Sequence, residues 1–284
     1  MTLHKFATVN DRRVFYREAG DPSLPTIILL HGFPTSSFMF RDLIPLLADR
    51  FHVIAPDYIG FGHSDAPPVS AFDYSLDNLT AHVAGLIEEL GLTSYILYMH
   101  DYGGPVGFRL FTQNPEAVTG FVIQNANAYM IGVGDPAAQI FLPLWAKRDA
   151  ASETAARSLL AAETTKFQYQ VGARDIDAVS PDNWTHDQAL LDRPGHDAAH
   201  LNLLHDYQTN VALYVSWHRA FRTHGPKTLI VWGRNDPFFV PAGADAYLAD
   251  LPQARLVWLD AGHFVLDENA AAVAAEIKAS FAAP

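Results

Sequence analysis

The 284-residue sequence has no cysteine, which excludes disulfide bonds and thiolate chemistry. Basic residues are scarce, with 19 Lys and Arg against 31 Asp and Glu, and the net charge of -12 disfavours nucleic acids and anionic membranes as partners. There is no apolar run of membrane-spanning length. The first residues also lack the apolar stretch of a signal peptide, so we expect a cytoplasmic location.

Short, continuous apolar runs recur along the chain. Runs of this kind are typical of strands buried on both faces, and hence of a parallel sheet covered by helices. We expect such strands at 26–30, 51–56, 94–99, 118–124, 228–233 and 255–260, after a hairpin of Lys5–Val9 and Val14–Glu18 that turns at Asn10-Asp11. Helices are expected at Ser36–Leu47, at Ser75–Leu90, from Asp101 to about Asn114, and at Asn269–Phe281.

The strand pattern is interrupted in the middle of the chain. Between Asn127 and Thr223, alanine-rich helical segments such as Ala150–Phe167 and His200–Arg222 replace it. We therefore predict an α/β core formed by residues 1–126 and 224–284, with an inserted helical cap at 127–223, within ordinary domain sizes.

Asp101 follows the apolar run at 94–99 and precedes a glycine-rich segment, Tyr102-Gly-Gly-Pro-Val-Gly107. This pattern predicts a strand, a tight turn and a helix, a corner that can expose one side chain at the carboxyl edge of a sheet. A carboxylate at that position indicates attack on carbon. On its own, Asp101 is better explained as a helix N-cap, with Pro105 in the first helical turn.

Two further polar residues follow late strands of the predicted sheet. Asp236 comes after Val231-Trp-Gly-Arg-Asn and His263 after Leu259-Asp-Ala-Gly. Loops at the carboxyl ends of parallel strands converge on one crevice. A turn aspartate and a loop histidine are the alternatives for each position alone. The order nucleophile, acid, histidine nevertheless matches hydrolases of this topology.

With these motifs the chain resembles the α/β-hydrolase superfamily, in particular its aspartate-nucleophile branch of epoxide hydrolases and haloalkane dehalogenases. The resemblance covers most of the chain and lies in His31-Gly-Phe-Pro34, Gly60-Phe-Gly-His-Ser-Asp65, His100-Asp-Tyr-Gly-Gly104, Trp232-Gly-Arg-Asn-Asp236 and Ala261-Gly-His-Phe264. It implies an α/β-hydrolase fold with a mostly parallel, twisted sheet flanked by helices. It also implies a cofactor-independent enzyme without a metal.

The resemblance implies a two-step reaction. Asp101 attacks an electrophilic carbon and forms an alkyl-enzyme ester. His263, oriented by Asp236, then activates the water that hydrolyses this ester. The backbone N–H groups of Phe33 and Tyr102 are expected to form the oxyanion hole.

The substrate class depends on the leaving group. Epoxide opening needs an acidic hydroxyl, and Tyr207 in Asp206-Tyr-Gln-Thr-Asn210 resembles the epoxide-activating cap tyrosine, although a packed helix aromatic is an equal alternative. Halide departure needs N–H donors, and this chain has Phe33 and Tyr102 where many dehalogenases have asparagine and tryptophan. Met99 and the segment 260–265 instead resemble dehalogenases, and Tyr207 could itself donate to a halide, as a cap tyrosine does in the related fluoroacetate dehalogenases. We expect an epoxide hydrolase, with haloalkane dehalogenase as the alternative.

The substrate is expected to be a small apolar molecule that reacts with water in a pocket between core and cap. The position of aromatic residues in the pattern predicts a lining that includes Phe33, Phe38, Trp145, Phe167 and Tyr207. Tyr169 is added as the candidate for a second cap tyrosine. We expect a monomer or a homodimer.

The sequence gives weaker support to other functions. His196, His200 and His205 lie near helical spacing, but no carboxylate–histidine signature accompanies them, so solvated cap histidines are favoured over a metal site. A non-catalytic binding protein on this fold is a distant alternative, as is cofactor-free oxygenation. Dinucleotide binding is excluded because the loop after Asp101 lacks the required glycine spacing.

Overall fold

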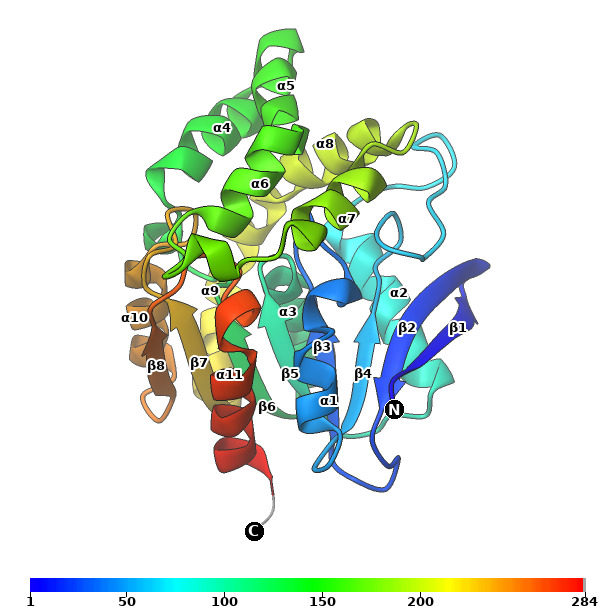
Figure 1. The fold of residues 1–284 in the computed structure, drawn as a ribbon, viewed down its shortest axis with the longest axis vertical. Coiled ribbons are helices and arrows are strands. Elements are labelled where there is room, and N and C mark those ends of the chain that lie inside the picture. Colours follow the sequence, from blue (N-terminus) through cyan, green and yellow to red (C-terminus); the bar gives the residue numbers. More distant parts are fainter. Residues whose placement is uncertain (283–284) are drawn as a thin grey trace.

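The computed structural model describes residues 1–282, within which eight strands form one sheet in the order β1-β2-β4-β3-β5-β6-β7-β8 (Figure 1). β2 runs antiparallel to both of its neighbours, whereas β3 to β8 are parallel to one another. The strands are β1 (Leu3–Val9), β2 (Arg12–Ala19), β3 (Thr26–Leu30), β4 (His52–Pro56), β5 (Tyr95–His100), β6 (Val118–Gln124), β7 (Lys227–Gly233) and β8 (Arg255–Leu259).

The continuous apolar runs all form strands, as predicted, but β8 lies at the edge of the sheet and none of its residues is buried. Every residue of β3, β4 and β5 is buried, because helices cover both faces of the sheet. The opening hairpin also forms, and Asn10 and Asp11 take the positive φ angles of 48° and 60° that a tight two-residue turn requires.

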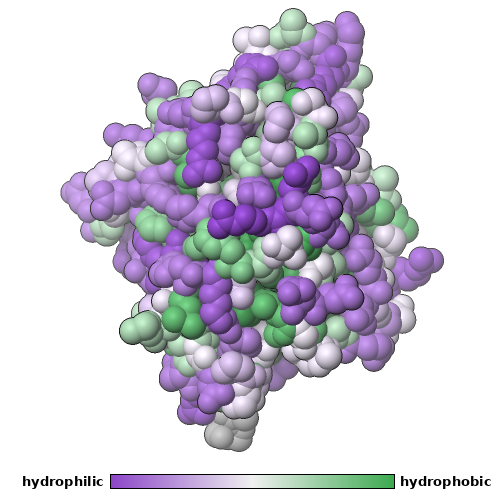
Figure 2. All heavy atoms as spheres, turned by 90° about the vertical axis from the view of Figure 1, so that its right-hand side faces the viewer, coloured by the Kyte–Doolittle hydropathy of each residue, from purple (hydrophilic) through white to green (hydrophobic). Residues whose placement is uncertain are grey.

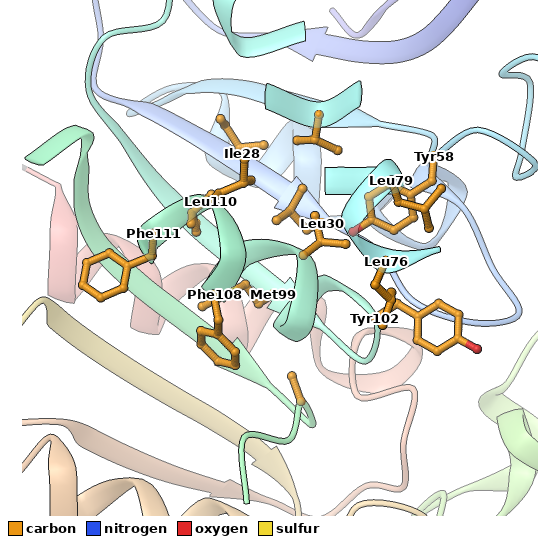
Figure 3. Packing of buried hydrophobic residues seen from close by; sticks show 14 of the residues in the cluster. Ile28, Leu30, Tyr58, Leu76, Leu79, Met99, Tyr102, Phe108, Leu110 and Phe111 are labelled. Carbon is orange, nitrogen blue, oxygen red and sulfur yellow. The ribbon is translucent and has the colours of Figure 1, made fainter. Parts of the chain in front are cut away.

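Helices cover the two faces of the sheet unequally (Figure 1). One face carries α1 (Leu43–Leu47) and α11 (Leu266–Phe281), and the other carries α2 (Leu76–Glu89), α3 (Gly103–Gln113), α10 (Pro241–Asp250) and much of α9 (Gln208–His224). Figure 3 shows the core on this second face, where Leu30 of β3 and Met99 of β5 lie beside Phe108 of α3.

One predicted helix is wrong in its extent. The segment Ser36–Leu47 is a short 3-10 turn, Ser37–Phe40, followed by α1. Pro45 explains the break, because proline has no N–H to continue an α-helical ladder from the preceding turn. In the structure Pro45 lies in the first turn of α1, where that N–H is not needed.

The chain between β6 and β7 is helical, and α4–α8 gather at one end of the sheet (Figure 1). These helices are α4 (Asp135–Ala146), α5 (Ala150–Arg157), α6 (Ala162–Gln170), α7 (Pro181–Leu191) and α8 (His196–Asp206). The predicted helix 150–167 is divided by a 3-10 turn at Ser158–Leu160. α9 lies partly outside this group, because its residues Trp217 and Phe221 pack against α3 in the core.

The surface is an ordinary mixture of residue types. On the face seen in Figure 2, hydrophilic residues dominate and hydrophobic residues form small groups. Within residues 1–282, none of the helices has the length and apolar character needed to cross a membrane.

Candidate active site

Asp101 lies at the sharp bend between β5 and α3. Its φ angle of 50° is in the left-handed region, which costs a residue with a side chain about 1–3 kcal/mol. The bend brings the backbone of Gly103 so close to Leu30 that a Cβ there would lie 2.3 Å from the Leu30 carbonyl oxygen. Glycine is therefore needed at 103, and the bend places the Asp101 side chain at the carboxyl edge of the sheet.

The loop after β3 brings a backbone donor to this carboxylate. Phe33 donates its backbone N–H to Asp101 Oδ1 at 2.7 Å, and the backbone N–H of Tyr102 also bonds to the Asp101 carboxylate. A Cβ on Gly32 would lie 2.2 Å from Asp101 Cβ, so the loop can approach this closely only with glycine there. The two N–H groups expected to form an oxyanion hole therefore do converge on Asp101.

His263 lies between two carboxylates. Its Nδ1 is 2.7 Å from Asp236 Oδ2, and its Nε2 is 3.9 Å from Asp101 Oδ2. All three side chains are buried. The structure thus brings together the three residues that the sequence places after β5, β7 and β8.

The charges in this cluster shift the titration of its members. Burial lowers the pKa of His263, but the charge and hydrogen bond of Asp236, with the charge of Asp101, outweigh burial and leave it raised. Burial raises the pKa of Asp101, opposed by the charge of His263 and by the N–H bonds of Phe33 and Tyr102. The two carboxylates therefore favour the protonated form of His263, while burial disfavours the ionised form of Asp101.

Asn125 is a further residue of the cluster that the sequence pattern did not single out. Its Nδ2 donates to Asp236 Oδ2 at 2.7 Å, and its Oδ1 accepts from the Gly233 N–H at 2.9 Å. Backbone N–H groups of Phe238 and Phe239 donate to the other Asp236 oxygen at 2.8 and 3.1 Å. Four bonds to Asp236, counting that of His263, fix the orientation of the imidazole. The position of Asn125 directly after the buried strand 118–124 was the available signal.

A cavity of about 50 Å³, room for a few water-sized groups, lies between the core and the helices above it. Asp101 and His263 reach it from the sheet side. Its lining is otherwise mainly apolar and consists of Phe33, Asp101, Tyr102, Pro136, Ala137, Phe141, Leu159, Gln168, Leu204, Tyr207, Phe238, Phe239 and His263.

Tyr207 contributes its side chain to this cavity from the junction of α8 and α9. Its ring is stacked on those of Phe141 and Trp145, with centroid distances of 5.8 and 6.1 Å. The hydroxyl is buried and has no hydrogen-bond partner among residues 1–282. Burial and neighbouring acidic groups raise the pKa of Tyr207 well above its ordinary value, so the phenol keeps its proton.

The chain on both sides of Tyr207 is tied to the core. Asp206 Oδ2 accepts the backbone N–H of Leu76 at the start of α2, at 2.7 Å. Asn210 Oδ1 accepts from Arg109 of α3 at 2.6 Å. Tyr207 is therefore held at a defined position above Asp101, although it belongs to a segment far away in sequence.

The four other predicted lining residues lie elsewhere. Phe38 packs on His186, 4.2 Å between ring centroids, and Phe167 is 51% exposed. Tyr169 stacks on Phe264 at 3.9 Å and donates its hydroxyl to Asp187, so it cannot be a second phenol of the cavity. Trp145 packs against the ring of Tyr207, and its indole N–H donates to the Leu204 carbonyl at 3.0 Å.

Two polar side chains of the cavity were not predicted as donors. The hydroxyl of Tyr102 and the Nε2 of Gln168 are buried and have no hydrogen-bond partner within the described part of the chain. Tyr169 was predicted as the second cap tyrosine of the cavity. The polar side chain that α6 contributes is instead Gln168, the residue directly before Tyr169.

Of the histidines considered as metal ligands, His196 and His200 are buried in α8 and His205 is half-buried, so the expectation of solvated cap histidines was wrong. The rings of His196 and His200 are 6.2 Å apart, and His200 packs against Phe33 and Phe61. In residues 1–282, no group of three or more His, Cys, Asp or Glu side chains is arranged to hold a metal ion.

Three comparisons with known proteins agree with this architecture. The sequence profile of the alpha/beta hydrolase fold matches residues 25–270. An uncharacterized hydrolase of Saccharomyces cerevisiae is 40% identical over 99% of this chain and 97% of its own length. Haloalkane dehalogenase 2 of Mycobacterium tuberculosis is 39% identical over 113 residues, which are 40% of this chain and 38% of that protein.

Solved structures show the same fold. The haloalkane dehalogenase DbeA from Bradyrhizobium elkani superimposes with a TM-score of 0.81 at 22% identity, over 98% of this chain and 96% of that one. Together with the sheet order and the profile match, this similarity confirms the predicted fold. The chain belongs to the α/β-hydrolase fold family.

Proposed function

We propose that this hydrolase attacks an electrophilic carbon with the carboxylate of Asp101, forms an alkyl-enzyme ester, and releases it with water, and that its substrates are small apolar epoxides. The core, 1–126 and 224–284, would supply Asp101 and His263. The cap, 127–223, would supply Tyr207 and most of the apolar lining.

The two oxygens of Asp101 have different surroundings, which supports a nucleophilic role. Oδ1 accepts the Phe33 N–H, whereas Oδ2 is not held by it and faces His263 Nε2 at 3.9 Å. Oδ2 is then the oxygen that bonds to carbon, and Oδ1 becomes the carbonyl oxygen of the ester. That oxygen already lies in the site that would stabilise an oxyanion.

The second step follows from the position of His263. Once Asp101 is esterified its negative charge is gone, and with it one of the influences that raise the pKa of His263. The imidazole therefore loses its proton more readily in the ester than in the free enzyme. It can then take a proton from water as that water attacks Cγ of Asp101.

The observation that carries the choice of epoxides is the unpartnered hydroxyl of Tyr207 in the same cavity as Asp101. A buried hydroxyl without a partner costs about 1–3 kcal/mol, so such a group is expected to serve a ligand. When an epoxide opens, the electron pair of the broken C–O bond stays on oxygen. The phenol can give that oxygen its proton.

The proton balance closes over the two steps. Ring opening leaves a phenolate on Tyr207 and an ester on Asp101. Hydrolysis first regenerates Asp101 as a neutral carboxyl group, and the proton of that group restores the phenol. The sum is epoxide plus water giving a diol.

Haloalkanes are the second candidate class, because the chain is similar to haloalkane dehalogenases in sequence as well as fold. Halide departure is helped by N–H donors around the anion. Among residues 1–282, those that line the cavity include no tryptophan. The indole N–H of Trp145 already donates to the Leu204 carbonyl. The unpartnered Nε2 of Gln168 is an N–H donor in the same cavity, so the preference for epoxides rests on Tyr207, which can supply the proton that an epoxide oxygen needs and a halide does not.

The test uses His263→Gln, which blocks the second step and lets the ester accumulate. Intact mass is measured after exposure to matched panels of apolar epoxides and haloalkanes, with His263→Gln/Asp101→Asn as the control that cannot be alkylated. We expect adducts from epoxides in the single variant alone. Adducts from haloalkanes only would reverse the order of the two classes, and none from either panel would refute the proposal.

A further inference from the structure

Gln168 presents a second unused donor to the cavity that holds Asp101. Its side chain is 5% exposed and lines the cavity, and its Nε2 has no hydrogen-bond partner among the residues described. A glutamine of the neighbouring helix α7 behaves differently. Gln188 is satisfied by Thr165, the Leu160 carbonyl and Asp192.

The position of Gln168 fits a contact with the leaving atom. A displacement at carbon needs the leaving atom on the side opposite to the attacking oxygen. Asp101 attacks from the sheet, so the leaving atom faces the helices above the sheet. Gln168 in α6 and Tyr207 at the start of α9 both line the cavity from those helices.

Tyr102 has the third unpartnered polar atom of the cavity, but it is differently placed. It follows Asp101 directly in the chain and begins α3 on the sheet side. Its ring nevertheless reaches the ring of Tyr207, with 5.8 Å between the centroids. Gln168 is the unpartnered donor that α6 adds from the helices above the sheet.

We propose that the amide N–H of Gln168 is a second hydrogen-bond donor to the atom displaced from carbon. In this proposal Gln168 orients the displaced atom, and Tyr207 both orients it and can give it a proton. An amide can hold and orient a developing anion but does not give up its proton. The phenol of Tyr207 can do both. Gln168 would therefore serve an epoxide oxygen and a departing halide alike, whereas proton donation by Tyr207 matters for the epoxide. This inference rests on the proposed function.

The test measures alkylation and ester hydrolysis separately. In the His263→Gln background, adduct formation is followed by rapid quench and intact mass. Adding Gln168→Leu should slow it by about a hundredfold, the usual effect of one donor to a developing anion. Decay of the ester in a single turnover with His263 present should change little, because the leaving atom has already been displaced. Gln188→Leu is the matched control, and it should leave the alkylation rate within about twofold of its parent.

Gln168→Glu distinguishes a donor from a packing group. A carboxylate repels the developing charge, while a protonated carboxyl can donate. The alkylation rate relative to the parent should therefore recover as the pH falls in Gln168→Glu and stay low in Gln168→Leu.

The inference is overturned if Gln168→Leu alkylates as fast as its parent, or if it slows alkylation and ester hydrolysis equally, as a packing defect would. Either result leaves the proposed function intact, provided that His263→Gln itself accumulates the epoxide adduct. If that parent forms no adduct, the proposed function fails first.

Discussion

Phe33 donates its backbone N–H to Asp101 Oδ1 at 2.7 Å, and this contact makes the two oxygens of one carboxylate unequal. Oδ1 is held against the loop after β3, and Oδ2 is left facing His263. In the proposed reaction the attacking atom of Asp101 is therefore defined, because the loop backbone comes within hydrogen-bond distance of only one of its two oxygens.

Gly32→Ala should disrupt this contact. The added Cβ would meet Asp101 Cβ at 2.2 Å, so the loop must move and the Phe33 N–H must move with it. We expect alkylation and ester hydrolysis each to slow by at least about a hundredfold in rapid-quench kinetics. Gly195→Ala is the control, because its φ of 83° costs stability but its Cβ would meet nothing within 4 Å. Wild-type rates in Gly32→Ala would contradict the assignment of the oxyanion site.

The pKa of His263 should report the two carboxylates beside it. Asp236 and Asp101 both raise this pKa against burial, so Asp236→Asn and Asp101→Asn should each lower it. The histidine resonances can be followed by NMR titration, with the signal lost in His263→Gln giving the assignment. An unchanged pKa in Asp101→Asn would mean that the carboxylate does not act on the imidazole, and that esterification does not make it a better base.

Tyr207→Phe should separate stability from activity. The hydroxyl is buried without a partner in the described residues, so its removal should raise the free energy of unfolding by about 1 kcal/mol in urea titrations. Ring opening of epoxides should fall by at least about a hundredfold, and alkylation by any haloalkane that reacts should fall less, since no proton is needed there. A variant that is more stable and equally active would show that Tyr207 only packs.

Asp187 should make stability depend on pH. Its side chain is fully buried in α7, and burial raises its pKa from 3.8 to about 7. Between these values the folded protein keeps a proton that the unfolded chain has lost. The contribution of Asp187 to stability is therefore present at low pH and declines as the pH rises to about 7, by on the order of 4 kcal/mol.

Asp187→Asn removes this titration while keeping an acceptor for Tyr169. The free energy of unfolding of the variant minus that of the wild type should increase from pH 5 to pH 8 in urea titrations, because only the wild type loses the contribution of Asp187. Titrating groups that do not interact with Asp187 cancel in that difference, whereas Asp267, whose charge acts on Asp187, contributes to it in the same pH range. A difference that is constant over this range would contradict the raised pKa.

The sequence predicted the sheet well because buried strands leave a local signal. Runs such as 26–30 and 118–124 are mainly apolar, and each became a strand with the expected bounds. The residues after these strands then follow from topology, since parallel strands end at one edge. Asp101, Asp236 and His263 could therefore be predicted to meet although 162 positions separate the first from the last.

The cavity lining could not be predicted as well, because α6 carries no clear apolar stripe. In Ala162–Gln170 polar residues occur on every face, and packing against α7 and the core decides which side turns inward. Phe167 therefore ends up exposed, while Thr165, Gln168 and Tyr169 are buried. A local pattern cannot supply that choice, and Tyr169 was predicted where Gln168 is found.

The most direct measurement is a single turnover of an apolar epoxide in water enriched in heavy oxygen, with enzyme in excess. Water attacks Cγ of Asp101 in the proposed reaction, so the peptide that contains Asp101 should gain one heavy oxygen. The diol should carry an oxygen that came from Asp101 and remain unlabelled. A labelled diol together with an unlabelled Asp101 would mean that water attacks the epoxide directly, and the covalent ester would be ruled out.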